Sequence, residues 1–157
     1  MRIAVASMAL AAAALPFAGA QTLTIDHLTQ SQLVEKAQEL SAKAQTGGGS
    51  AGVKLNDYPN HFTMLSLRHK NGGAEIHENF ADIFFVLQGK ATLVTGGVVK
   101  DAKTVSSGEI RGDSVQNGSS TILNQGDIVH IPATLPHQLL VSDGGEFVYF
   151  VIKVKEK

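Results

Sequence analysis

A succession of short β-forming segments constrains the fold of this chain more than any other feature. Each segment is rich in β-branched or aromatic residues and is bounded by Gly, Asn or Asp, as strands and their turns are. Many short strands with no helix between them predict an all-β sandwich or barrel. The sequence Asn71-Gly72-Gly73 is typical of a hairpin turn. The predicted strands lie within residues 62–69, 82–89, 90–97, 120–127, 128–133, 137–145 and 146–154.

One helix precedes these strands. Apolar residues at spacings of three and four predict an amphipathic helix over residues 26–45, with its buried stripe at Leu33, Val34, Ala37, Leu40 and Ala44. Thr29 and Gln32 fit a capping box, and the Gly-rich segment 46–52 ends the helix as a hinge. We therefore divide the chain into a helix and hinge, residues 21–50, and a β-domain, residues 51–157. We expect the helix to pack on the outside of that domain or against a partner subunit.

Residues 1–20 have the pattern of a cleavable signal peptide. Arg2 is followed by an apolar run that ends at Leu15, and Ala18-Gly19-Ala20 supplies the small residues that signal peptidase reads. The alternative is a membrane anchor, but the apolar run is short for a membrane span and has no charged stop after it. We expect cleavage after Ala20, a periplasmic or secreted mature protein, and no membrane association after cleavage.

Charge and cysteine content exclude several classes of function. Lys and Arg number 13 and Asp and Glu number 14, for a formal net charge of −1, and no basic run occurs. Binding to nucleic acid is therefore not expected. The chain has no cysteine, which excludes disulfides, thiolate catalysis and cysteine-based metal sites.

Four side chains suited to metal coordination lie at informative spacings. Glu75 and His77 are two apart, so on one strand they point to the same face. A short loop returns Asp82 beside them, and His137 follows a proline turn in the second half of the chain. Two imidazoles and two carboxylates from three strands suit Mn, Fe, Ni, Zn or Cu. Glu78, next to His77, is expected to face solvent.

These residues and their spacing resemble the cupin family. The first cupin motif, G-x5-H-x-H-x(3–4)-E-x6-G, is matched in spacing from Glu75 to Gly89. The second, G-x5-P-x-G-x2-H-x3-N, is matched from Gly126 to His137. The leading glycine of the first motif is missing. Four substitutions depart from the family pattern: Glu75 for the first histidine, Asp82 for glutamate, Thr134 for glycine and Val141 for asparagine.

The resemblance implies a cupin-type jelly-roll β-barrel, or double-stranded β-helix, with one N-terminal amphipathic helix. It implies a divalent metal held by Glu75, His77, Asp82 and His137, a small-molecule substrate, and an oxygenase, isomerase or lyase type of reaction. It also implies a homodimer, because small cupins often pair. The alternative is a non-catalytic cupin that binds a small ligand or sugar. Without metal, Glu75 and Asp82 would repel, one would keep a proton, and the pair would be a candidate catalytic acid and base.

The remaining polar residues give weaker hypotheses. Residues 96–120 are polar and are interpreted as an excursion between strands or, alternatively, a short hairpin of their own. Within this segment, Arg111 lies between glycines in what we interpret as a loop, and it is a candidate clamp for a carboxylate substrate. The alternative is a solvated loop charge. His130 is a candidate at the pocket mouth or, alternatively, a packed histidine. Residues 153–157 are interpreted as a solvated tail.

Overall fold

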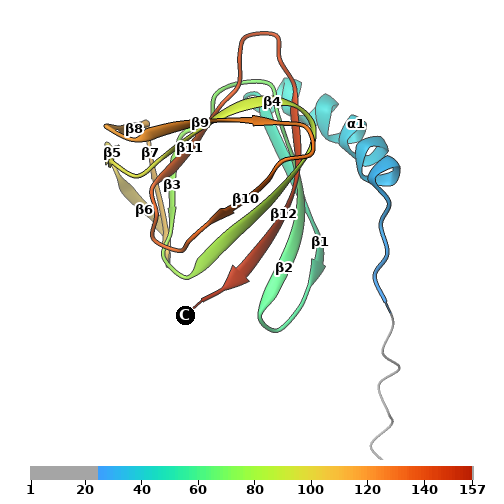
Figure 1. Ribbon diagram of the computed structural model, residues 1–157, viewed down its shortest axis with the longest axis horizontal. Coiled ribbons are helices and arrows are strands. Elements are labelled where there is room, and N and C mark those ends of the chain that lie inside the picture. Colours follow the sequence, from blue (N-terminus) through green and yellow to red (C-terminus); the bar gives the residue numbers. More distant parts are fainter. Residues whose placement is uncertain (1–24, 157) are drawn as a thin grey trace, which may run out of the picture.

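The computed structural model describes residues 25–156 (Figure 1), so the predicted signal peptide lies outside the described residues. No helix within this range is long and apolar enough to cross a membrane. The described part contains one helix, α1 (Gln30–Thr46), and twelve strands. The strands are β1 (Ser50–Asp57), β2 (His61–Arg68), β3 (Ala74–His77), β4 (Phe80–Thr95), β5 (Val98–Lys100), β6 (Lys103–Ser106), β7 (Glu109–Gly112), β8 (Ser114–Gln116), β9 (Ser119–Asn124), β10 (Ile128–Ile131), β11 (His137–Leu140) and β12 (Phe147–Lys155).

Strand β4 joins the two sides of a curled sheet. Its first half pairs with β12 and β10, and its second half pairs with β9 and β11. Gly89 lies between the halves with φ 84°, in the left-handed region that glycine adopts without steric cost. The segments 82–89 and 90–97, predicted as two strands, are therefore one bent strand. The expected all-β jelly-roll barrel is confirmed, and the barrel is seen in Figure 1.

The main core fills the space between the two sides of this curled sheet. Alternation along β12 turns Phe147, Tyr149 and Val151 inward, where they meet Phe84 and Val86 of β4. Side chains of the opposite side complete the cluster: Leu93, Leu123 and Leu139. The inward face of β12 therefore leads from the core toward the polar site described below.

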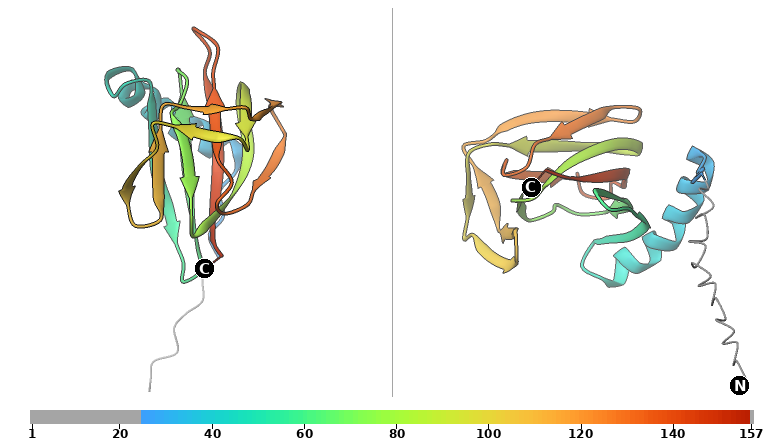
Figure 2. Two further views of the ribbon diagram at one scale, coloured as in Figure 1. Left: turned by 90° about the vertical axis from the view of Figure 1, so that its left-hand side faces the viewer. Right: turned by 90° about the horizontal axis from the view of Figure 1, so that it is seen from below.

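Helix α1 covers the outer face of the sheet (Figures 1 and 2). It buries its predicted stripe against β2, β4 and β12, at Leu65, Leu67, Leu87 and Val148. The Thr29–Gln32 capping box is present and confirms the predicted cap, although the helix begins at Gln30 and not at residue 26. The predicted packing of the helix on the outside of the domain is confirmed. Strand β1 begins at Ser50, within the segment predicted as a hinge.

One sequence prediction about the connections is wrong. Asn71-Gly72-Gly73 does not close a hairpin, because β2 pairs with β1 and β12 whereas β3 pairs with β11 and β7. The segment instead crosses from one side of the sheet to the other, and Gly72 N–H donates to the carbonyl oxygen of Leu139 at 2.8 Å. Residues 96–120 carry β5 to β8. Strands β6 and β7 form a hairpin, as the alternative interpretation expected, and β7 lies directly beside β3. Strands β5 and β8 form a separate two-stranded sheet.

Candidate metal site

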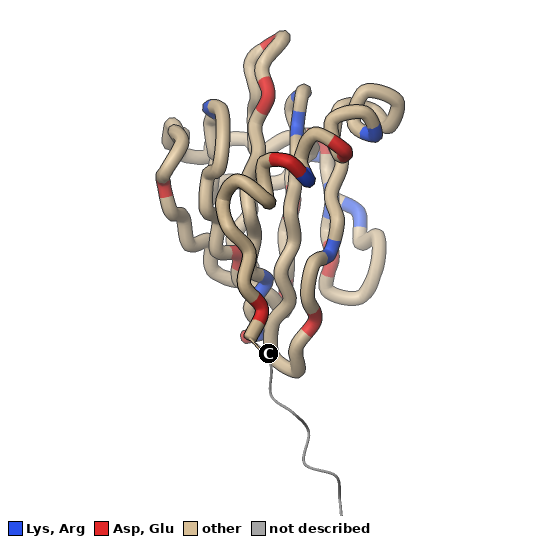
Figure 3. The backbone as a smooth tube through the Cα atoms, turned by 90° about the vertical axis from the view of Figure 1, so that its right-hand side faces the viewer, with Lys and Arg blue, Asp and Glu red and all other residues tan. Residues whose placement is uncertain are grey.

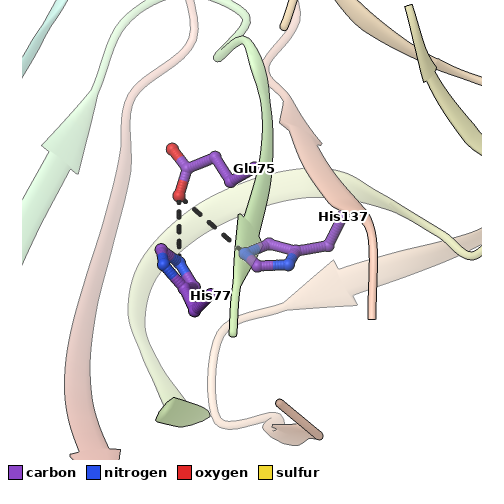
Figure 4. A group of neighbouring side chains, drawn as sticks. All are labelled: Glu75, His77 and His137. Carbon is purple, nitrogen blue, oxygen red and sulfur yellow. Dashed lines mark ion pairs between the residues drawn. The ribbon is translucent and has the colours of Figure 1, made fainter. Parts of the chain in front are cut away.

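Backbone pairing brings the predicted site residues together. Glu75 of β3 lies opposite His137 of β11, and His77 follows on the same face of β3. Figure 4 shows Glu75, His77 and His137 pointing toward one another, with Glu75 Oε2 3.4 Å from His77 Nε2 and 3.8 Å from His137 Nε2. Asp82 Oδ2, from β4, lies 3.5 and 3.7 Å from the same two nitrogens. The structure therefore places all four side chains around one point.

Hydrogen bonds fix which nitrogen of each imidazole faces that point. His77 Nδ1 lies 2.8 Å from the carboxylate of Glu109, and His137 Nδ1 lies 3.0 Å from the carbonyl oxygen of Leu135. Both partners are acceptors, so each Nδ1 carries a proton and Nε2 is the nitrogen that faces the common point. His77 and His137 are 4% and 3% exposed, and both Nε2 atoms lack a hydrogen-bond partner. Buried polar atoms without a partner are costly and rare.

The spacing of these atoms fits a divalent metal. One donor atom from each of Glu75, His77 and His137 can be chosen so that all three lie within 4.8 Å of one another. Ligands at about 2.1 Å in a tetrahedral site are about 3.4 Å apart, close to the separation of Glu75 from His77. Two neutral imidazoles and one carboxylate form a three-ligand set that leaves positions open for a substrate. A carboxylate or carbonyl on Nδ1 is also the usual support of a metal-binding histidine.

Two arginines hold Glu75 in its ionised form. Arg111 Nη1 lies 2.6 Å from Oε2, and Arg68 Nη2 lies 3.2 Å from Oε1. Burial alone would raise the pKa of Glu75, but the charges of Arg111 and Arg68 outweigh it and hold that pKa well below its usual range. Glu75 is therefore not the carboxyl of the metal-free pair that would keep a proton. Its carboxylate acts as an acceptor and not as an acid.

At His137, burial outweighs the charges of the neighbouring side chains. Desolvation lowers the pKa of the imidazole, against the hydrogen bond with Leu135 and the nearby carboxylates, which raise it. The ring is therefore neutral at neutral pH, and its Nε2 lone pair is free to bind a cation.

Asp82 pairs with Lys153, a contact that was not predicted from the sequence. Its side chain is 2% exposed, and Lys153 Nζ lies 2.5 Å from Oδ1 and 2.7 Å from Oδ2. Lys153 was assigned to a solvated tail, and that prediction is wrong because β12 extends to Lys155. Period-two alternation after Tyr149 and Val151 puts Lys153 on the inward face, a signal that the sequence does contain.

Strand β7 supplies two further site residues. Arg111 lies in this strand opposite Glu75, and Glu109 lies opposite His77. The interpretation of Arg111 as part of a loop is therefore wrong. Its side chain is 40% exposed and bridges Glu75 and Glu109, with Nη2 2.9 Å from Glu109 Oε2. Glu109 was not predicted, and its period-two spacing from Arg111 is the only local signal for it.

The structure does not bring His130 into the site. It is exposed on β10, where the neighbouring Ile131 is the inward residue. Both the substrate-binding hypothesis and the packed alternative are wrong for this residue. Glu78 is exposed, as predicted.

The site opens into a cleft of about 590 Å³. Its lining combines the polar groups already described with Phe62, Met64 and Tyr149. The volume of this cleft is sufficient for a small organic molecule. Elsewhere in the described chain, acidic and basic residues are interspersed (Figure 3).

The backbone also supports the correspondence with the cupin motifs. Gly89, Gly126 and Thr134 occupy three of the four motif positions at which cupins have glycine, and their φ values are 84°, 91° and 69°. A positive φ explains why glycine is preferred there. Thr134 keeps this conformation despite a β-branched side chain, and its N–H donates to the carbonyl oxygen of His77 at 2.8 Å.

Comparisons with known proteins agree on the fold. No family model matches the sequence, and no curated protein matches it. A conserved protein with a double-stranded β-helix domain from Klebsiella pneumoniae superposes with a TM-score of 0.52 and 16% identity, over 69% of this chain and 79% of that one. The DMSP lyase DddQ from Ruegeria pomeroyi gives 0.52 and 16%, over 72% and 50%. The Cnp3 cupin domain from Schizosaccharomyces pombe gives 0.51 and 8%, over 68% and 65%.

These similarities establish the cupin fold, which confirms the resemblance found in the sequence. At such low identity they establish the fold alone. The chain spans half the length of the lyase.

Proposed function

We propose that this cupin is an exported metalloprotein that binds one divalent ion through Glu75, His77 and His137 and acts on a small molecule in the adjacent cleft. The observation that carries the proposal is the pair of buried, unpartnered Nε2 atoms directed at one point beside a carboxylate. Mn, Fe, Ni, Zn and Cu all accept such a ligand set. Export rests on the signal-peptide pattern of residues 1–20.

The surrounding residues have distinct roles in this proposal. Glu109 and the carbonyl of Leu135 hold the imidazoles in the ligating tautomer. Arg68 and Arg111 keep Glu75 ionised and oriented. Asp82 faces the same point and is the carboxylate placed to exchange a proton with a bound molecule, with Lys153 fixing its orientation. A divalent ion, when bound, polarises a carbonyl group or activates water.

The reaction class is an oxygenase, isomerase or lyase type. A lyase among the structural neighbours supports this range, because it shows that the same barrel carries such chemistry. The alternative is a cupin that binds a small ligand without metal or catalysis. One observation favours it: every carboxylate at the site already has a cationic partner.

Elemental analysis of the mature protein tests the proposal. Protein purified from the periplasm is expected to begin at Gln21 and to carry close to one transition-metal ion per chain. His77→Ala and His137→Ala are expected to lose it, whereas His130→Ala, which alters an exposed histidine outside the site, retains it. Absence of a stoichiometric metal after growth and reconstitution with each candidate ion would favour the metal-free alternative.

A further inference from the structure

The charged side chains of the candidate site balance one another before any metal binds. Three acids and three cations meet there: Glu75, Asp82 and Glu109 with Arg68, Arg111 and Lys153. Lys54 also lines the cleft, but it pairs with Asp57 at 2.8 Å. Both histidines turn Nε2 toward the common point, and a metal ion would bind them as neutral ligands. The site therefore has no excess negative charge to offset a divalent ion.

A site that binds a divalent ion by itself usually has an excess of negative charge, and this site has none. A divalent ion bound by Glu75, His77 and His137 would leave two uncompensated positive charges beside the buried side chains of His77 and His137. Lys153 is 13% exposed and lies against Asp82, so its charge persists beside the ion. Uncompensated charge is costly in such surroundings, and a negative ligand at the open positions would remove the cost.

Arg111 indicates where the negative ligand would bind. It is the most exposed of the three cations, and its Nη1 shares Glu75 Oε2 with the expected metal position. An ion bound to Oε2 would share the negative charge of Glu75, so Arg111 would lose part of the charge that now balances it. The guanidinium would then have capacity for a second carboxylate, and it lies on the cleft wall.

We propose that the divalent ion and an anionic small molecule, a carboxylate or another oxyanion, bind this cleft cooperatively. This inference rests on the proposed metal site and adds the charge class of its ligand. By linkage, the anion tightens metal binding by the same factor as the metal tightens anion binding.

The test measures the Mn²⁺ dissociation constant of the apoprotein from the EPR signal of free Mn²⁺. Titrations are made at constant ionic strength without addition, with malonate, and with malonamide as the uncharged match, after correction for Mn²⁺–malonate complexes in solution. Malonate is expected to lower the dissociation constant at least about tenfold, which is typical of a coupled pair of sites, and malonamide is expected to have no effect. An equal dissociation constant in all three solutions would overturn the inference.

A charge variant separates this explanation from nonspecific effects of malonate. Lys153→Met removes one cation and leaves Asp82 to offset the ion, so Mn²⁺ should bind more tightly without malonate and respond less to it. Lys90→Met is the matched control, because Lys90 is exposed on the second half of β4. An undiminished malonate effect in Lys153→Met would contradict the charge-balance account. Failure of the wild type to bind Mn²⁺, Zn²⁺ or Co²⁺ in any solution would instead contradict the proposed metal site.

Discussion

At the scale of single residues, Thr134 carries local backbone strain next to the site. Its φ of 69° is unfavourable for a β-branched residue, and its side chain is exposed. We predict that Thr134→Gly stabilises the protein by up to about 1 kcal/mol, because relief of strain exceeds the added entropy of the unfolded chain. Urea denaturation measures the change. Thr104→Gly, at an exposed strand position without positive φ, is expected to destabilise, and a loss of stability in both variants would contradict the interpretation.

Glu109 is the residue through which β7 acts on the site. Its carboxylate holds Nδ1 of His77, so Glu109→Gln should weaken metal binding by about 10- to 100-fold without removing a ligand. Competition with a chelator of known affinity measures the effect. Glu78→Gln is the control, because Glu78 is adjacent to His77 but exposed. Equal affinities in the two variants would show that Glu109 does not position the imidazole.

At the scale of elements, the bend in β4 depends on Gly89. A Cβ at this position would collide with the backbone carbonyl oxygen of Glu146, in addition to the strain of φ 84°. Gly126 has φ 91° but open space around it, so the two glycines separate steric contact from backbone strain. We predict that Gly126→Ala costs about 1 kcal/mol and Gly89→Ala at least twice that amount. Thermal denaturation of both variants measures the two losses of stability. A larger loss for Gly126→Ala than for Gly89→Ala would contradict the prediction.

The sequence predicts elements better than it predicts their partners. The helix stripe at Leu33, Ala37 and Leu40 and the alternation in β12 are local patterns, and both are present in the structure. The motif spacing likewise placed Glu75, His77, Asp82 and His137 at one site. Alternation places Glu109 and Lys153 on one face of their strands, but their contacts with His77 and Asp82 depend on the registers of β7 with β3 and of β12 with β4. No local pattern fixes those registers, and the glycines around Arg111 suggested a loop.

At the scale of the whole molecule, we predict a homodimer. Apolar side chains beside the helix remain accessible in the single chain: Ile128 is 64% exposed and Leu28 is 45% exposed. Covering such groups is favourable, and a paired arrangement is common for cupins of this size. Light scattering over a range of concentrations is expected to return twice the mass of the mature chain. A monomeric mass at the highest concentration would contradict this prediction.

The central claim is that one divalent ion binds between Glu75, His77 and His137. Crystals of the mature protein loaded with its metal should give an anomalous difference peak about 2.0–2.2 Å from Nε2 of His77, Nε2 of His137 and a carboxylate oxygen of Glu75. The absorption edge identifies the element, and the map shows whether Asp82 remains with Lys153. A fully loaded crystal with its peak elsewhere, or with either Nε2 outside coordination distance, would contradict the assignment of this site.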